Sequence, residues 1–322
     1  MTRLTQRRLH QLLALSLLAG LTTFASAQTK TTRILVAFPP GGPVDFVART
    51  LTDQLSKELG HQVMVENKAG ANGAIAADTL LKAPADGQTL WLTSVGAVAI
   101  NPSLYPSLAY DPVRDLAPVS LVVNNVEMLV VNPNNPVNTP QEFIAAAKLK
   151  RVTMASSGTG SVPHLAMELL ADATHTDLVH IPYKGAAPAI TDVMAGHVDG
   201  FFGDIPGLMG QVRNGKLKPV AIAATRRHPL FPDVKTFQEI GVPGVDSDNW
   251  YALFAHKNTP PAELERLNQA VRRTLVTESV RNKLIASGAE PSGNSSAELS
   301  ALLKADMAKW GRVIRLKKIT AD

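Results

Sequence analysis

Short β-rich runs alternate with helix-patterned stretches from Arg33 onward, and this alternation restricts the fold more than any other feature of the sequence. Such alternation is typical of α/β domains in which helices flank mostly parallel sheets. The predicted strands cover residues 34–38, 63–66, 90–93, 119–123, 128–131, 152–155, 179–181, 198–202, 220–224 and 251–255. The sequence therefore predicts an α/β fold.

Local signals mark several of the intervening helices. Thr139 and Ser295 each precede a glutamate by three residues, a pattern that predicts a capping box at a helix start. An apolar stripe from Leu299 to Val313 predicts a C-terminal helix docked on the core. Apolar residues three or four apart predict a further helix face packed on a sheet, at Val44, Val47, Ala48, Leu51, Leu55 and Leu59.

The length of 322 residues favours two lobes with separate cores over one large domain. Two stretches leave one strand–helix series and enter another, at residues 126–133 and 250–255, and we interpret them as crossings between lobes. We expect lobe one to comprise residues 28–125 plus 254–322, and lobe two to comprise residues 126–253.

Residues 1–27 have the pattern of a cleaved secretory signal peptide. Three arginines precede an apolar stretch at 12–21, and a small-residue cleavage site follows at 25–27. The apolar stretch is about ten residues long, against the ~20 that a membrane anchor needs. The pair Arg7-Arg8 leaves the Sec and twin-arginine routes both open. We expect a periplasmic protein that is soluble after cleavage.

Composition argues against several classes of protein. The chain has no cysteine, which excludes disulfides, thiolate metal sites and a lipid-anchored cysteine. Its net charge of +5 at pH 7 is too small to indicate nucleic-acid binding. Its eight histidines lack ligand spacings such as H-E-x-x-H. We expect no metal, no cofactor, no nucleic-acid partner and a monomer.

A glycine-rich turn follows the first predicted strand, at residues 38–45. Gly41 and Gly42 permit a close backbone approach, and Pro43 suits the first position of a helix. Such a turn directs free N–H groups and the positive end of the helix dipole at one point, where a carboxylate or phosphate is stabilised. An ordinary strand-to-helix turn is the alternative.

A comparable turn follows the predicted strand 152–155, where residues 156–161 read SSGTGS. Its hydroxyls add to the free amides, and it contains neither a Walker lysine nor a spaced G-x-G-x-x-G, so a nucleotide fits poorly. We favour a carboxylate site over a plain helix cap here.

Two other side chains have both a functional and a structural interpretation. Asp204 ends a predicted strand, where it could accept a hydrogen bond from a ligand hydroxyl or ammonium, or cap the helix after Pro206. His164 beside Ser157 or Ser161 would suit a hydrolase, but no nucleophile elbow or positioned acid accompanies them. We expect His164 to make structural hydrogen bonds.

Taken together, several segments resemble those of the Bug-type extracytoplasmic solute receptors of tripartite tricarboxylate transporters. Each segment alone is weakly specific, but their order and spacing extend over more than 200 residues. The segments are 39–42 (PPGG) with Asp45 and Ala48-Arg49, 66–73 (ENKAGANG), 99–105 (AINPSLY), 156–161 with His164-Leu165, 182–185 (PYKG) with Pro188-Ala189, 203–204 (GD) and 250–251 (WY).

The resemblance implies a two-lobed, periplasmic-binding-protein-like fold that closes on a small organic carboxylate and delivers it to membrane transporter subunits. No catalytic residue is implied. The implied ligand-binding residues are Pro40, Gly41, Gly42, Asn72 and Gly73 in lobe one, with Ser157, Gly158, Thr159, Gly160, Ser161 and Asp204 in lobe two. An exported sensory receptor for a membrane kinase and a hydrolase remain the alternatives.

The sequence departs from the family pattern at Ala97-Val98, where many relatives carry a hydroxyl and an imidazole. If this loop lines the cleft, its apolar character favours a monocarboxylate or aromatic carboxylate over citrate. If the loop packs inward, it says nothing about the ligand.

Overall fold

The computed structural model describes residues 30–320, so the predicted signal peptide lies outside the described residues. From Thr31 onward the chain belongs to one compact unit. The strands are β1 (Thr31–Val36), β2 (Gln62–Asn67), β3 (Thr89–Ser94), β4 (Leu116–Val131), β5 (Val152–Ser156), β6 (Leu178–Pro182), β7 (Gly200–Asp204), β8 (Lys218–Ile222), β9 (Asp248–His256) and β10 (Glu290–Pro291).

The helices are α2 (Pro43–Leu59), α3 (Ala74–Leu81), α4 (Asn101–Leu104), α5 (Pro112–Asp115), α6 (Pro140–Leu149), α7 (Val162–Thr174), α8 (Ala186–Ala195), α9 (Ile205–Arg213), α10 (Pro261–Val276), α11 (Glu278–Ser287) and α12 (Ser296–Lys317). Short turns of helix add η1 (Ala71–Gly73), η2 (Gly96–Ile100) and η3 (Gln238–Ile240). None of the helices within residues 30–320 combines the length and apolar character that a membrane crossing requires.

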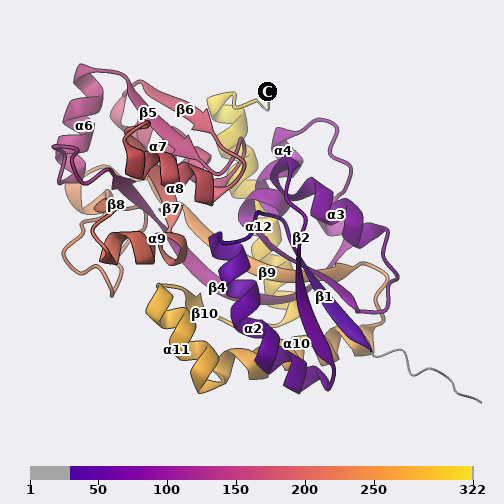
Figure 1. Cartoon of the computed structure of the whole chain (residues 1–322). Helices are drawn as coiled ribbons and strands as arrows, with labels where there is room; N and C mark the ends of the chain where they lie inside the picture. Colours follow the sequence, from indigo (N-terminus) through magenta and orange to yellow (C-terminus); the bar gives the residue numbers. More distant parts are fainter. Residues whose placement is uncertain (1–29, 321–322) are drawn as a thin grey trace, which may run out of the picture. The chain divides into compact units, whose positions relative to one another are not determined.

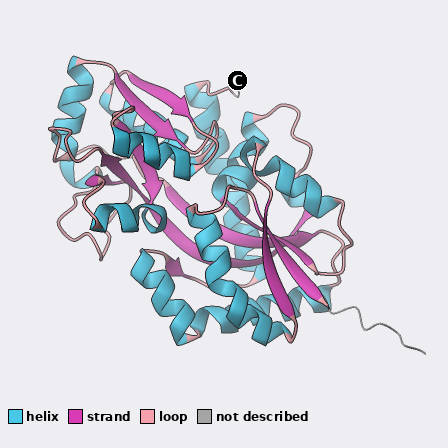
Figure 2. Cartoon of the chain, viewed as in Figure 1, coloured by secondary structure: helices cyan, strands magenta, loops and turns pink. Residues whose placement is uncertain are grey.

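Two groups of parallel strands are joined by a pair of antiparallel strands (Figure 1). In the first group β1 pairs in parallel with β2 and β3, and in the second β5 pairs in parallel with β6 and β7. The antiparallel pair β4 and β9 lies between them, with β9 next to β3 and β4 next to β7. Helices flank the strands of both groups (Figure 2), so the predicted α/β fold is confirmed.

Strand β4 corrects one prediction. Two separate strands were predicted at 119–123 and 128–131, with residues 124–127 between them, but β4 runs unbroken from Leu116 to Val131. Pairing with β9 holds the backbone extended through Asn125, and pairing with β7 takes over at Glu127. The predicted lobe boundaries at 126 and 253 fall within β4 and β9, and the division into lobes stays a prediction.

The first parallel group has a core on each face, as the period-2 alternation of a strand requires. Ile34 and Val36 of β1 face the apolar stripe of α2, together with α10 and α11. Leu35, between them, faces the opposite side, where Trp91 packs with Leu303 and Trp310 of α12. The C-terminal helix therefore docks on the core as predicted.

The second group is built in the same way. Leu129 of β4 and Met154 of β5 pack against α6 and α7, and Met128 and Ala155 pack against α8 and α9 on the other face. In both groups a parallel strand is followed by a loop and then by a helix. The helix starts therefore lie together at the carboxyl ends of the strands.

Of the two predicted capping boxes, one is fully formed and the other is formed in part. Ser295 and Glu298 form a complete capping box at the start of α12. At α6 the Thr139 hydroxyl accepts a hydrogen bond from the Glu142 amide, but the Glu142 carboxylate accepts from the amide of Asn138, one residue earlier than a capping box requires. That box is therefore only half formed.

Candidate functional site

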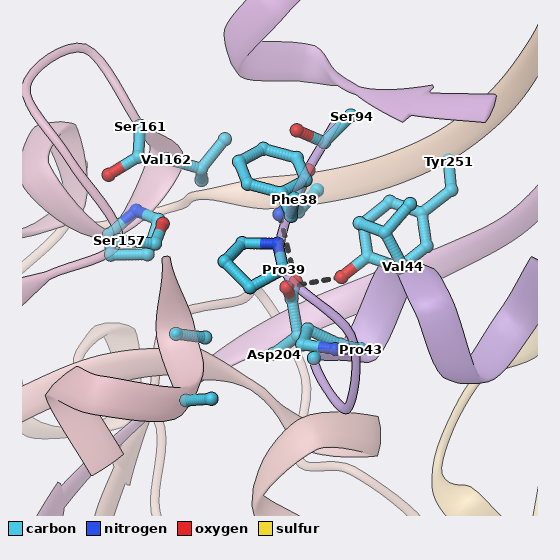
Figure 3. A pocket seen from close by; sticks show the side chains of 15 residues that line it. Phe38, Pro39, Pro43, Val44, Ser94, Ser157, Ser161, Val162, Asp204 and Tyr251 are labelled. Carbon is cyan, nitrogen blue, oxygen red and sulfur yellow. Dashed lines mark hydrogen bonds between the residues drawn. The ribbon is translucent and has the colours of Figure 1, made fainter. Parts of the chain in front are cut away.

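A narrow pocket lies where the two groups of strands meet. Figure 3 shows Ser157 and Ser161 on one side of it and Ser94 and Tyr251 on the other. Its lining comes from the loops after β1 and β5, from the first residues of the helices α2, α7 and α8, from the ends of β3 and β7, and from β9. The lining residues are Phe38, Pro39, Gly42, Pro43, Val44, Ser94, Ser157, Ser161, Val162, Pro163, Ala186, Ala187, Asp204, Asn249 and Tyr251.

Four helices begin at this pocket. Its lining includes the first residues of α2, α7 and α8, and Asp204, which is the residue before α9. Amides in the first turn of a helix have no acceptor within the helix, and the helix dipole places partial positive charge there. Each of these helices has nine residues or more. The pocket is thus suited to an anion without a cationic side chain.

Fewer of the predicted residues in the loop after β1 line the pocket than expected. Gly42 lines the pocket, but Pro40 and Gly41 are exposed and lie outside the lining. The Gly41 amide donates to the Asp45 carboxylate (N···Oδ2 3.0 Å), and Gly41 has a φ of +83° that favours glycine. Pro40 and Gly41 therefore shape the loop, and Gly42 is the residue of the three that a ligand could touch.

Asp45 anchors this loop to its surroundings. It accepts hydrogen bonds from Arg49 (2.9 Å) and from Asn67 (2.9 Å), in addition to the Gly41 amide. Burial opposes ionisation of Asp45, but these bonds outweigh it, and the pKa of the carboxyl is lowered below its usual value. The loop is thus held by an ionised group at neutral pH.

In the loop after β5, three of the amides predicted to bind the ligand already have partners. The amide of Gly158 donates to the Ser156 hydroxyl, that of Gly160 to His164 Nδ1, and that of Ser161 to the Gly158 carbonyl. Within the described residues, no acceptor is positioned to bond the amides of Ser157 and Thr159. Of the predicted amide contacts in this loop, only those of Ser157 and Thr159 therefore remain available to a ligand.

Ser157 lies at the junction of two pockets. A second, wider pocket of about 550 Å³ shares Phe38, Pro39 and Ser157 with the first. Gly158, Thr159 and Asn72 line this second pocket. Of the residues predicted to bind the ligand, the structure thus brings Gly42, Ser157, Ser161 and Asp204 together at the first pocket and Ser157, Gly158, Thr159 and Asn72 at the second.

Gly160 and Gly73 line neither pocket and have packing roles instead. Both have positive φ, and a Cβ on Gly160 would lie 2.2 Å from Leu104 Cδ2, while one on Gly73 would lie 2.8 Å from Ala97 Cβ. Ala97 and Val98 are fully buried and face the core. The loop at 97–98 packs inward, which removes the basis for preferring a monocarboxylate or aromatic acid.

Asp204 is the centre of a buried hydrogen-bond cluster at the base of the first pocket. Its carboxylate accepts from Tyr251 Oη (Figure 3) and from Asn249 Nδ2 (2.8 Å), and the same Asn249 nitrogen donates to Glu127 Oε1 (3.1 Å). The Asp204 side chain makes no capping bond to α9, so the alternative interpretation as a helix cap is wrong.

Burial raises the pKa of Asp204 to about 6, although the bonds from Tyr251 and Asn249 act in the opposite direction. Burial, reinforced by the nearby charge of Asp204, raises the pKa of Glu127 well above its usual value. Asn249 is 3% exposed, and its Oδ1 has no hydrogen-bond partner among the described residues. The base of the pocket therefore contains a buried acceptor without a partner among the described residues.

His164 makes structural contacts, as the sequence analysis expected. Its Nδ1 accepts from the Gly160 amide (3.2 Å), and its ring stacks on His180 with centroids 3.8 Å apart. Ser156 Oγ lies 2.6 Å from His180 Nε2, but Ser156 is fully buried and lines neither pocket. Burial, with the nearby His164 as a lesser cause, lowers the pKa of His180 to about 3, so the ring is neutral.

Sequence reasoning missed several lining residues. Asn249 and Tyr251 belong to the antiparallel strand β9, and Ser94 ends β3. Ala186 and Ala187 open α8 directly after the PYKG segment, so a third strand-to-helix turn was the signal that could have revealed them. Among the described residues no group of three or more His, Cys, Asp or Glu side chains is arranged to hold a metal ion.

Comparison with known proteins places this geometry in a family. The family model described as the tripartite tricarboxylate transporter family receptor matches residues 47–319. The protein BugT of Bordetella pertussis is 35% identical over 303 residues, which cover 92% of this chain and 93% of BugT.

Two solved structures are also similar. MatC from Rhodopseudomonas palustris with bound malate is 33% identical, with a TM-score of 0.83 over 89% of this chain and 99% of that one. A second R. palustris protein, solved with adipate, is 30% identical, with a TM-score of 0.88 over 91% of this chain and 99% of that one. The chain belongs to the receptor family of the tripartite tricarboxylate transporters, whose members bind solutes for transport.

Proposed function

We propose that this receptor captures a small organic carboxylate in the pocket in front of Asp204 and delivers it to the membrane subunits of a transporter. The observation that carries the proposal is the convergence of four helix starts on one pocket. Such an arrangement stabilises a negative guest without requiring a lysine or arginine. The malate and adipate bound in two similar structures support the same class of ligand.

The ligand carboxylate would contact the hydroxyl of Ser157 and the first-turn amides of α2 and α8, while the Ser161 hydroxyl, which donates to the Gly158 carbonyl, holds the loop after β5. We assign α2 to lobe one, residues 28–125 plus 254–322, and α7, α8 and α9 to lobe two, residues 126–253. Because the two lobes then supply different parts of one anion site, only a bound ligand contacts both, and binding favours the closed form. Pro40, Gly41, Gly73 and Gly160 lie outside this pocket, and their role would be to hold the loops that carry the contacts.

This mechanism involves no catalysis, and the ligand is released unchanged. The protein acts as a monomer in the periplasm, and the signal peptide is removed on export. The burial of Ser156 supports this assignment, because a nucleophile must reach the substrate and Ser156, the serine beside His180, has no exposed surface.

A charge placed at a helix start tests the proposal. Ala187→Glu adds a negative charge at the second residue of α8, where it lines the pocket, and should weaken binding of malate or adipate at least 100-fold by calorimetry. The matched control is Gln141→Glu, at the second residue of α6, which is exposed and outside both pockets.

The control should bind as tightly as the wild type, and both variants should keep the far-UV circular dichroism of the wild type. If Ala187→Glu bound these acids as well as the control does, the pocket would not be the anion site. Mass spectrometry of the acid recovered after incubation should show it chemically unchanged.

A further inference from the structure

Two carboxyl groups lie together beneath the proposed anion site. Asp204 at the end of β7 is the register partner of Glu127 in β4, so both side chains lie on the same face of the sheet. Asn249 Nδ2 bridges them, at 2.8 Å from Asp204 Oδ1 and 3.1 Å from Glu127 Oε1. Asp204 lines the pocket, and Glu127 is fully buried behind it.

No cation balances this pair within the described residues, where neither carboxyl forms an ion pair. The titratable groups that face Asp204 are Glu127 from β4 and Tyr251 from β9, and neither can supply positive charge. Glu127 Oε2 is buried and has no hydrogen-bond partner among the described residues. Two buried carboxylates so arranged cannot both be ionised, so the pair holds a proton.

A bound carboxylate brings a further negative charge into the pocket that Asp204 lines. The helix starts favour that charge, but an ionised Asp204 opposes it. Building on the proposed function, we propose that the Asp204–Glu127 pair takes up one proton from solvent when the carboxylate binds, so that affinity rises as the pH falls. The proton forms an O–H bond on a carboxylate oxygen of Asp204, and the ligand stays ionised.

The sign and the pH range follow from the charge of the pair. With Glu127 protonated throughout, the remaining proton belongs to Asp204, whose pKa of about 6 in the free protein rises further when a negative ligand lies beside it. Proton uptake occurs between these two values. There the affinity should increase by up to about tenfold for each unit of decrease in pH, and it should level off below about pH 6.

The test is calorimetric titration with malate and adipate at pH 7 in Bis-Tris and in Tris, two cationic buffers that absorb different heats when they give up a proton. The difference in binding enthalpy gives the number of protons taken up. The wild type should take up a measurable fraction of one proton, and Asp204→Asn should take up close to none and bind with nearly the same affinity from pH 6.5 to pH 8.

Glu127→Gln gives a second, independent variant in case Asp204→Asn folds poorly. Its neutral amide replaces a carboxyl that is already protonated and, like that carboxyl, can donate to Asp204, so proton uptake at pH 7 should persist, and its loss would overturn the assignment of the proton to Asp204. Asp306→Asn is the control, because burial also raises the pKa of Asp306, which accepts a hydrogen bond from Trp250 Nε1 (2.6 Å) but lines neither pocket. Its proton uptake should equal that of the wild type.

The outcomes separate this inference from the proposed function. Binding of either acid without proton uptake in the wild type would overturn the inference and leave the receptor function intact. Uptake that persists unchanged in Asp204→Asn would assign the proton to a group other than Asp204 and would also overturn the inference. Failure of both acids to bind at any pH would remove the proposed function and the inference together.

Discussion

Replacing Tyr251 by phenylalanine tests whether Asp204 is an ionised acceptor at neutral pH. Tyr251 is fully buried, and its hydroxyl donates to Asp204, so the substitution removes one hydrogen bond and leaves the ring packing in place. A hydrogen bond to a charged group contributes about 1.5–3 kcal/mol, against about 0.5–1.5 kcal/mol for a neutral pair. We therefore expect a loss of stability of about 1.5–3 kcal/mol at pH 8.

The expected pH dependence follows from the pKa of Asp204. Since the folded-state pKa of about 6 lies above the usual value, folding takes up a proton between these values, and the contribution of Asp204 to stability falls as the pH rises through that range. The Tyr251 hydroxyl offsets part of this fall by favouring the ionised form. At pH 5 the carboxyl is largely protonated, so the substitution should cost about 0.5–1.5 kcal/mol there.

Tyr110→Phe is the matched control. Tyr110 is 3% exposed, and its hydroxyl donates to the neutral carbonyl of Ala97 (2.5 Å), so its loss should cost the same at both pH values. The assay is urea denaturation followed by circular dichroism at pH 5 and pH 8. A cost for Tyr251→Phe that is equal at the two pH values and equal to that of Tyr110→Phe would show that Asp204 is not charged at pH 8, and the reasoning would fail.

Two other substitutions test how the loops are built. Gly160→Ala should lower the free energy of unfolding by about 2–4 kcal/mol in thermal or urea denaturation, because the new Cβ would lie 2.2 Å from Leu104 Cδ2 at a φ of +79°. The control is Gly215→Ala, at a φ of +65° with open space around it, which should cost only about 1 kcal/mol. Equal costs would contradict the described packing. Ala97→Thr should destabilise the protein by about 1–3 kcal/mol, since Ala97 is fully buried against Gly73, and should leave the relative affinities for malate and adipate unchanged; a changed preference would place this loop in the site.

Strand and helix positions were largely predictable because hydrophobic periodicity reflects which faces are buried. The α2 stripe and the C-terminal docking helix follow from this rule. The rule failed at residues 124–127, where Asn124, Asn125 and Glu127 interrupt the apolar run. The extended conformation of the two asparagines depends on hydrogen bonding to β9, a partner more than 120 residues away in the chain.

The general location of the site was predictable for a comparable reason. Loops that follow parallel strands meet at one edge, so the turns after β1 and β5 were expected to lie close together, and Asp204 with them. The antiparallel strands β4 and β9 gave no such signal. Glu127 of β4 and Asn249 and Tyr251 of β9 were therefore missed as members of the Asp204 cluster. Nor does sequence show that an amide such as that of Gly160 is already bonded to His164.

The pairing of β4 with β9 limits how the two groups of strands can move. They are hydrogen-bonded partners through Val126 and Asp248, so the connection is a two-stranded ribbon and not a pair of independent tethers. Its register is irregular between Leu121 and Val123, and β4 shifts against β8 between Leu129 and Val130, on either side of the crossing. A change in the relative position of the two groups of strands therefore requires both strands of the ribbon to bend together, and the local bends at these irregularities are where that is easiest.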